Sequence, residues 1–382
     1  MIVLKKILFL IVFLSFIFPC FVNASDITPN AASAVMIDYN SGDILYEKNK
    51  DERRSVASLT KMMGLLLIFE KIEAGKININ EFLVVSRTAK EMGGTQIWLE
   101  EGEKISVDDL LKGVTMASAN DAMVLLAERA SGSENAFVEE MNKKAKVLNL
   151  KNTHFENCTG FDSEGAYSSA YDMSIIAKEL IKHKKVLSYT GKYEDYIREN
   201  SDNKSWIVNT NKLVKFYPGV DGLKTGYEEK AGSTIAVTSL KNGLRLIAVS
   251  LGYSNTKDRN TEAMNLLDYG YSKYEGNIVF EKGKTMKKIK VPKSLNEKIS
   301  LNLKDNVIIV NKKGEKKKNY TYDIEITNNK LPLKRNDVVG KLILKSNDRV
   351  LSETPLITNK DVNSTNFLKQ YLKVLSDSFS GA

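Results

Sequence analysis

Apolar and polar residues alternate over residues 34–48, and the alternation is interrupted at Asn40-Ser41-Gly42. Such a polar, glycine-containing break between alternating segments predicts two strands joined by a tight turn. Residues 233–240 and 244–251 flank a turn of the same kind, Lys241-Asn242-Gly243. We therefore expect two β-hairpins, one from each end of a long segment.

Between the hairpins, apolar residues recur at helical spacing. Residues 58–74 place Met62, Leu65 and Phe69 on one face, and Gly75 stands where a helix is expected to end. Further helices are expected at 107–114, 121–131, 133–148, 174–183 and 260–274. Helices enclosed by strands from both sides indicate an α+β fold.

The pattern changes after residue 276, where short, lysine-rich alternating segments predict a small all-β domain over 277–358. Residues 359–382 are expected to hold an amphipathic helix, because residues 364–379 gather their apolar side chains on one helical face. Such a helix can lie on a membrane surface or pack against its own domain, and both alternatives remain open.

Residues 1–24 have the pattern of a signal peptide. Lys5 and Lys6 precede an apolar run over 7–18, and Val22-Asn23-Ala24 suits cleavage after Ala24. The run is shorter than the roughly 20 residues of a membrane span, so cleavage is favoured over a retained anchor. We expect an exported protein that acts at the outer membrane face or in the wall, with a first domain over residues 25–276.

Composition narrows the chemistry. Removal of residues 1–24 leaves Cys158 as the sole cysteine, which excludes an intrachain disulfide and a thiol-metal cluster. Only the histidines His154 and His183 are present, without metal-ligand spacing, so no metal or other cofactor is expected. With so few histidines, a Ser-His-Asp triad is also disfavoured. The net charge of +9 suits wall polymers or acidic lipid, rather than nucleic acid, in an exported protein, although solvated surface lysines explain it equally well.

Ser58-Leu59-Thr60-Lys61 carries a hydroxyl and an amine three residues apart at an expected helix start. One helical turn returns the two side chains to the same face, within contact. A lysine can take the proton of a nucleophilic serine once burial and nearby positive charge lower the lysine pKa. Because Ser201 to Lys204 and Ser254 to Lys257 repeat the spacing, the context must decide.

Two later motifs supply that context, Ser118-Ala119-Asn120 and Lys224-Thr225-Gly226. Ser-x-x-Lys, a Ser/Asn motif and Lys-Thr-Gly in this order are typical of penicillin-binding proteins and class A β-lactamases. Ser201-Asp202-Asn203 matches the middle motif more literally. We reject it because it lies in a polar stretch about 20 residues before Lys224, whereas Ser118 lies between amphipathic helices.

The third motif is suited to substrate binding. Lys224 adds a positive charge that helps to keep Lys61 neutral and attracts a carboxylate. Thr225 can donate a hydrogen bond to that carboxylate. Gly226 leaves the strand edge open, so that the substrate backbone can lie beside it.

The other polar groups are suited to proton transfer and charge stabilisation. Ser118 can pass a proton to the leaving amine, and Asn120 can hold the substrate amide and Lys61. The backbone N–H groups of Ser58 and Tyr227 can form an oxyanion hole.

The chain resembles D-alanyl-D-alanine carboxypeptidases of the penicillin-binding protein 5 type from residue 34 to about residue 275, and more loosely beyond. The resemblance implies a β-lactamase-like (transpeptidase-like) catalytic fold, a β domain behind it and a membrane-tethering helix. It also implies that Arg259 helps to bind the terminal carboxylate. Val56 and Ala119 depart from the family pattern without removing a reacting group, and Tyr227 stands where some relatives carry a histidine, which bears on pH dependence and substrate preference. The stretches that carry the resemblance are residues 57–62, 93–95, 117–122, 167–173 and 221–232.

From these residues we expect Ser58 to remove the terminal D-alanine from peptidoglycan pentapeptide stems through an acyl-enzyme, and to bind β-lactam antibiotics covalently. A β-lactamase is disfavoured because no Glu-x-x-Leu-Asn occurs between Asn120 and Lys224. An endopeptidase of wall cross-links and a non-catalytic wall-binding protein stay open as alternatives. The oligomeric state is not predicted.

Overall fold

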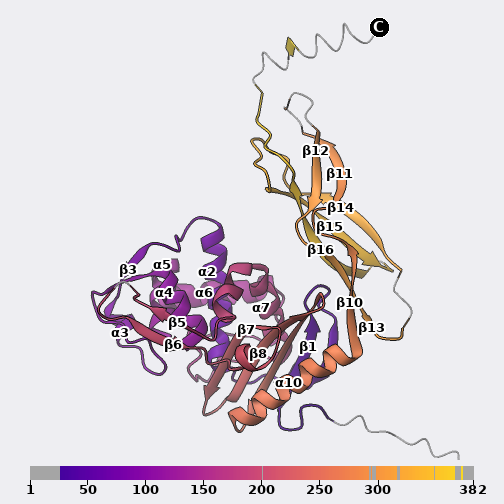
Figure 1. Cartoon of the computed structure of the whole chain (residues 1–382). Helices are drawn as coiled ribbons and strands as arrows, with labels where there is room; N and C mark the ends of the chain where they lie inside the picture. Colours follow the sequence, from indigo (N-terminus) through magenta and orange to yellow (C-terminus); the bar gives the residue numbers. More distant parts are fainter. Residues whose placement is uncertain are drawn as a thin grey trace, which may run out of the picture.

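The computed structural model describes residues 26–199, 201–291, 294, 298–315, 319–347, 349–365 and 371–372. The expected signal peptide and most of the expected C-terminal helix lie outside these residues. The described chain forms a body of helices and sheet, followed by an elongated β body (Figure 1). Within the described part, no helix has the length and apolar character needed to cross a membrane.

The first body is organised around a five-stranded antiparallel sheet with the order β2-β1-β9-β8-β7. Met36 is paired with Ala248, so the N-terminal hairpin joins the later one edge to edge. Both hairpins predicted from the alternating pattern are confirmed. The strands are β1 (Ser33–Asp38), β2 (Ile44–Lys48), β7 (Val220–Glu228), β8 (Gly232–Lys241) and β9 (Leu244–Tyr253).

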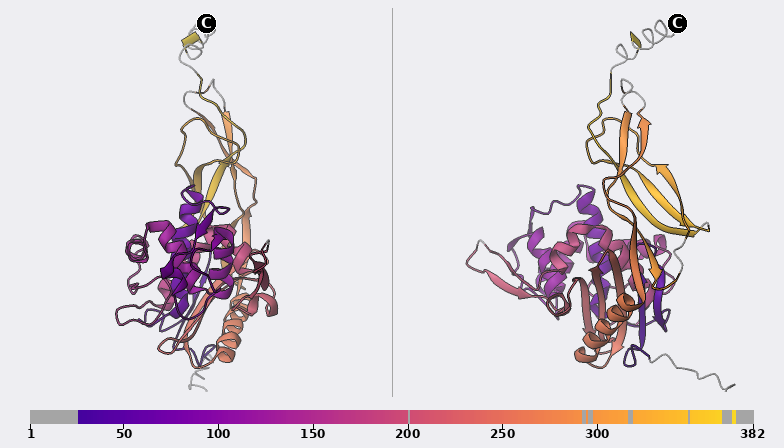
Figure 2. Two further views of the ribbon diagram at one scale, coloured as in Figure 1. Left: turned by 90° about the vertical axis from the view of Figure 1, so that its left-hand side faces the viewer. Right: turned by 45° about the vertical axis from the view of Figure 1, so that its right-hand side comes forward.

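The two faces of this sheet contact different helices. Val35 and Ile37 of β1 lie in the larger apolar core with α2 (Lys61–Glu73) and α7 (Ala170–Lys182). Ala34 and Met36 point the other way, into a smaller core with α10 (Thr256–Lys273). Successive side chains of a strand point to opposite faces, which is why one strand serves both cores. Figure 2 shows α10 lying along the outer face of the sheet.

The remaining elements of the first body complete its helical part and add two short two-stranded sheets. The expected helices are present, but some begin earlier than expected because their N-caps precede the first residue of the apolar pattern. Ser169 is the N-cap of α7, and Asn255 is the N-cap of α10. The short β5–β6 hairpin was not predicted. The other elements are α3 (Arg87–Lys90), α4 (Val107–Lys112), α5 (Asn120–Ser131), α6 (Glu134–Val147), α8 (Leu187–Thr190), α9 (Leu213–Phe216), β3 (Phe82–Val84), β4 (Lys104–Ser106), β5 (Glu194–Ile197) and β6 (Ser205–Val208), with 3₁₀ turns η1 (Ala57–Thr60) and η3 (Lys184–Val186) and the π-helical turn η2 (Gly113–Ala117).

The second body is all β. A two-stranded ribbon continues from α10, and a five-stranded antiparallel sheet has the order β11-β12-β16-β15-β14 around its own apolar core. An ion pair of 2.6 Å between Lys184 and Asp305 links the two bodies. These observations confirm an α+β domain followed by an all-β domain. The strands are β10 (Tyr274–Phe280), β11 (Thr285–Lys290), β12 (Lys298–Leu303), β13 (Val307–Lys312), β14 (Thr321–Ile326), β15 (Val338–Ser346) and β16 (Arg349–Thr358).

Candidate active site

Ser58 lies in η1, and Lys61 is the first residue of α2. The Nζ atom of Lys61 is 2.8 Å from Ser58 Oγ and donates to the Thr159 carbonyl oxygen at 2.6 Å. The Lys61 side chain is fully buried, whereas Ser58 is partly exposed. The contact expected from the three-residue spacing is therefore present, although it is made by a 3₁₀ turn that precedes the α-helix.

The Lys61 amine has an environment that favours its neutral form. Burial lowers the Lys61 pKa from 10.5 to about 7, and the negative groups around it, Glu228 and Asp121 among them, act in the opposite direction. Desolvation penalises an ammonium because the protein interior solvates charge poorly. Near neutral pH a substantial fraction of Lys61 is thus able to accept a proton.

The Thr159 carbonyl that contacts Lys61 is presented by a tight turn. Asn157 Oδ1 accepts hydrogen bonds from the backbone N–H groups of Thr159 and Gly160, at 3.2 and 2.6 Å. Gly160 has φ +87°, and a Cβ there would lie 2.1 Å from the Ala57 carbonyl oxygen, so only glycine fits against η1. Sequence reasoning missed Thr159 because it contributes a backbone atom, and the Asn-x-Thr-Gly turn signal was the available clue.

Ser118 and Asn120 enter the site from the junction of η2 and α5. Ser118 has φ 67° and ends η2, and Asn120 begins α5. Asn120 Nδ2 donates to the Gly93 carbonyl at 2.9 Å, and the Asn120 backbone N–H donates to the Thr95 carbonyl at 2.7 Å. These bonds attach the loop around residues 93–95 to the second motif.

Lys224 of β7 joins the third motif to the second. Its Nζ atom donates to Ser118 Oγ at 2.7 Å and to the Thr225 carbonyl at 2.8 Å, and its side chain is 1 % exposed. Burial, together with the charges of Lys61 and Arg259, holds the Lys224 pKa well below its ordinary value. Burial is the largest cause at both lysines; the charge of Lys61 lowers the Lys224 pKa, whereas the expected effect of Lys224 on Lys61 is not among the causes of the Lys61 shift.

Strand β7 also lies against η1, the turn that holds Ser58. A Cβ at Gly226 would lie 2.9 Å from the Ser58 backbone nitrogen, so a side chain at this position would collide with η1. Thr225 Oγ1 donates to Thr210 Oγ1 at 2.8 Å, a partner that sequence reasoning did not identify. Tyr227 follows with 65 % of its side chain exposed at the end of the strand.

Arg259 lies in the first turn of α10 and is buried. Its guanidinium donates to Asn260 Oδ1 at 3.1 and 2.9 Å, and burial lowers its pKa to about 10. Its charge acts on Lys224, so the two cations face the same region. The rejected Ser201-Asp202-Asn203 stretch lies elsewhere, in the turn of the exposed β5–β6 hairpin, where Ser201 Oγ donates to the Arg198 carbonyl.

Comparisons with known proteins agree with this arrangement. The family of D-alanyl-D-alanine carboxypeptidases matches residues 21–255, and the C-terminal domain of penicillin-binding protein 5 matches residues 274–364. The D-alanyl-D-alanine carboxypeptidase DacF of Bacillus subtilis is 44% identical over 354 residues, which cover 92% of this chain and 91% of that protein.

Two solved structures are also similar. Penicillin-binding protein 5 from Haemophilus influenzae has a TM-score of 0.65 and 30% identity, over 88% of this chain and 98% of that chain. Penicillin-binding protein D2 from Listeria monocytogenes, in its ampicillin-bound form, has a TM-score of 0.57 and 30% identity, over 63% of this chain and 98% of that chain. The chain therefore belongs to the family of serine-type D-alanyl-D-alanine carboxypeptidases, and it carries both the catalytic and the C-terminal domain of the penicillin-binding protein 5 type.

Proposed function

We propose that Ser58 is the nucleophile and Lys61 its general base in the removal of the terminal D-alanine from peptidoglycan pentapeptide stems. The observation that carries this proposal is the 2.8 Å contact between Ser58 Oγ and the Nζ atom of a fully buried lysine with a pKa near 7. A base is most effective when its pKa lies near the working pH.

In the first step, Ser58 Oγ forms a bond to the carbonyl carbon of the penultimate D-alanine while its proton passes to neutral Lys61. Collapse of the tetrahedral intermediate breaks the C–N bond, and the leaving nitrogen takes a proton, so that D-alanine departs as a free amino acid. Water then adds to the ester on Ser58, releases the shortened stem and restores the hydroxyl and amine.

The Ser118–Lys224 contact supplies a route for the proton that the leaving amine takes. Ser118 Oγ accepts a hydrogen bond from Lys224 Nζ, so a hydroxyl stands between one lysine and the cleft. A substrate carboxylate beside Lys224 favours the ammonium form of this lysine, because an opposite charge offsets the cost of burial. Thr225 and Arg259 would bind the same carboxylate, and Asn120 would orient the substrate amide.

Backbone N–H groups of Ser58 and Tyr227 would stabilise the oxyanion. This role is supported by the close approach of β7 to η1 at Gly226, which places the two backbone segments side by side. Donors fixed before the reaction stabilise developing negative charge without reorganising.

Covalent capture of penicillin tests the nucleophile. Benzylpenicillin is expected to acylate Ser58, and mass spectrometry of the digested protein would locate the adduct. Ser58→Ala should abolish labelling, whereas Ser254→Ala, at the exposed Ser/Lys pair of the same spacing, should retain it. An adduct on any other residue contradicts the assignment.

We also propose that the enzyme is exported by residues 1–24 and held at the outer membrane face by the amphipathic segment 364–379, both of which lie mostly outside the described residues. The support is the sequence pattern of each segment. The full mature chain should sediment with vesicles of phosphatidylglycerol, and a chain ending at Thr365 should not. Equal binding by both chains contradicts the tether.

A further inference from the structure

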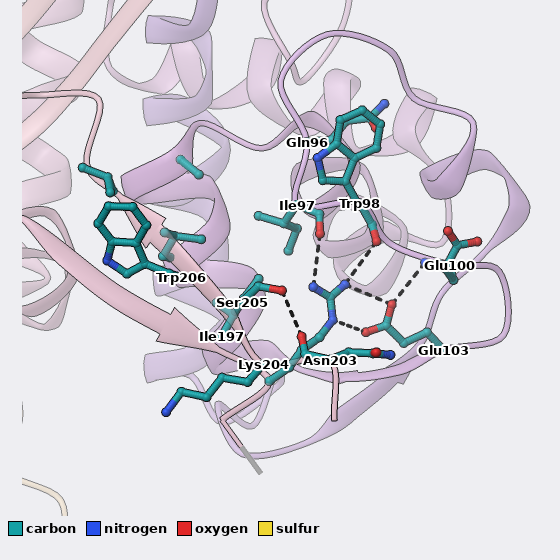
Figure 3. A pocket seen from close by; sticks show the side chains of 14 residues that line it. Gln96, Ile97, Trp98, Glu100, Glu103, Ile197, Asn203, Lys204, Ser205 and Trp206 are labelled. Atoms are coloured by element: carbon teal, nitrogen blue, oxygen red, sulfur yellow. Dashed lines mark hydrogen bonds and ion pairs between the residues drawn. The ribbon is translucent and has the colours of Figure 1, made fainter. Parts of the chain in front are cut away.

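A groove opens between the loop of residues 96–103 and the β5–β6 hairpin (Figure 3). Its volume is about 890 Å³, which lies within the roughly 300–1,000 Å³ range of small-molecule sites. Ile97, Ile197 and Ile207 supply apolar lining, and Gln96, Asn203 and Ser205 supply neutral polar groups. The groove is thus amphipathic, and its charged residues are Glu100, Glu103, Arg198 and Lys204.

Two tryptophans stand at opposite sides of this groove, Trp98 on the loop and Trp206 on β6 (Figure 3). They are the only tryptophans of the chain, and they are 75 % and 59 % exposed. Large aromatic side chains left in water next to one concave surface are typical of a binding site, because their burial by a ligand is favourable.

The backbone holds Trp98 in an unfavourable conformation. Trp98 has φ 58° and Arg198, which faces it, has φ 57°, values that cost a bulky residue about 1–3 kcal/mol. Arg198 donates to the carbonyls of Ile97 and Trp98 at 3.1 and 3.3 Å and pairs with Glu103. Several interactions therefore maintain the outward position of the Trp98 indole, which indicates a function for it.

The groove is attached to the second catalytic motif. Asp121, the residue after Asn120, accepts hydrogen bonds from the backbone N–H groups of Ile97 and Leu99. Ala117, the residue before Ser118, lines the groove. A stem of five residues spans at most about 17 Å, so a sugar at its far end remains near the reacting groups. Substrate held at Ser58 can thus extend into this groove.

We propose that the Trp98–Trp206 groove binds an N-acetylated amino sugar of the glycan strand that bears the stem peptide. The proposal rests on the carboxypeptidase function. A pyranose ring has flat C–H faces that pack against indole rings, and its hydroxyl and acetamido groups match the neutral amides and hydroxyl of Gln96, Asn203 and Ser205. The charged residues of the lining already have partners, since Arg198 pairs with Glu103, Glu100 with Lys90 and Lys204 with Glu199. The ionised groups of a stem peptide would have to compete with these pairs.

Intrinsic fluorescence reports on the groove directly, because both tryptophans of the chain line it. The full mature chain carrying Ser58→Ala would be titrated with a peptide-free tetrasaccharide of N-acetylglucosamine and N-acetylmuramic acid. We expect a saturable change in tryptophan emission. Emission that is unchanged at millimolar tetrasaccharide overturns the proposal.

A kinetic comparison separates this proposal from the carboxypeptidase mechanism. We would measure kcat/KM for D-alanine release from a disaccharide-pentapeptide and from the free pentapeptide. Their ratio should fall about tenfold in Trp98→Ala and in Trp206→Ala, which corresponds to one aromatic contact. It should stay unchanged in Phe82→Ala, which removes an exposed aromatic residue outside the groove.

An unchanged ratio of the kcat/KM values in both tryptophan variants overturns sugar binding. If the unchanged ratio comes with an equal loss on both substrates, the stem peptide occupies the groove instead. In either case the unmodified enzyme still releases D-alanine from the free pentapeptide. Failure of the proposed mechanism would instead abolish that release, so the two failures are distinguishable.

Discussion

The pH dependence of penicillin acylation follows from the burial of Lys61. The Lys61 pKa is lowered from 10.5 to about 7, a shift that corresponds to roughly 5 kcal/mol of preference for the neutral amine. At pH 7 about half of the enzyme then holds Lys61 neutral, roughly a thousandfold more than an unperturbed lysine would allow. The buried contact therefore supports the proposed role of Lys61 as a base at neutral pH.

The expected profile has a defined shape. Because the neutral amine is the active form, the second-order rate of acylation by benzylpenicillin should rise about tenfold from pH 6 to pH 8, with an inflection near 7. Stopped-flow measurement with a fluorescent penicillin would give these rates. The carboxylate of the penicillin does not titrate in this range and so contributes no inflection.

Histidine is the other side chain that ordinarily titrates near pH 7, and the chain has only His154 and His183. Replacing both with glutamine should leave the inflection in place. Loss of the inflection in that variant would assign it to histidine. A profile that is flat from pH 6 to 8, or that rises only above pH 9, would refute the inference that burial of Lys61 prepares the base.

Three further predictions follow from the same region. Glu228→Gln should move the acylation inflection to lower pH, because the Glu228 carboxylate raises the Lys61 pKa; an upward shift would contradict this. The free energy of unfolding, measured by urea titration, should rise between about pH 7 and 10, because in this range the unfolded chain binds a proton that folded Lys61 lacks. Lys61→Met should reduce the increase of the unfolding free energy with pH. Gly160→Ala should lower stability by more than about 2 kcal/mol and abolish penicillin labelling, because its Cβ would meet Ala57, whereas Gly75→Ala, also at positive φ but in open space, should cost only about 1 kcal/mol. Equal melting temperatures for the two glycine variants would argue against the steric explanation.

Local patterns were sufficient to predict the parts of the site that depend on one element. The Ser58–Lys61 contact follows from residues three apart on a helical turn, and the hairpins follow from alternation around Asn-containing turns. The order of the three motifs then indicated the family. The signals for the contact and for the hairpins each lie within a few residues, so tertiary context does not alter them.

Features that depend on tertiary packing were not predictable in the same way. The Thr159 carbonyl reaches Lys61 from 98 residues away and has no side-chain signature. The main cause of the Lys61 pKa, its complete burial, depends on how α2 and its neighbours pack; the sequence argument named burial as a requirement but could not show that this side chain is buried. The β5–β6 hairpin, with Trp206 on its surface, was interpreted only as a polar stretch because its strands are short and partly exposed.

Release of D-alanine from a diacetyl-Lys-D-Ala-D-Ala peptide by Lys61→Met tests the central claim most directly. Methionine is linear and uncharged, so it preserves the packing of the buried side chain while it removes the base. We predict a loss of about 10²- to 10⁴-fold in kcat with an unchanged far-ultraviolet spectrum, and an unaltered rate for Lys257→Ala at the exposed Ser/Lys pair. A folded Lys61→Met enzyme that releases D-alanine at the unmodified rate would contradict the account.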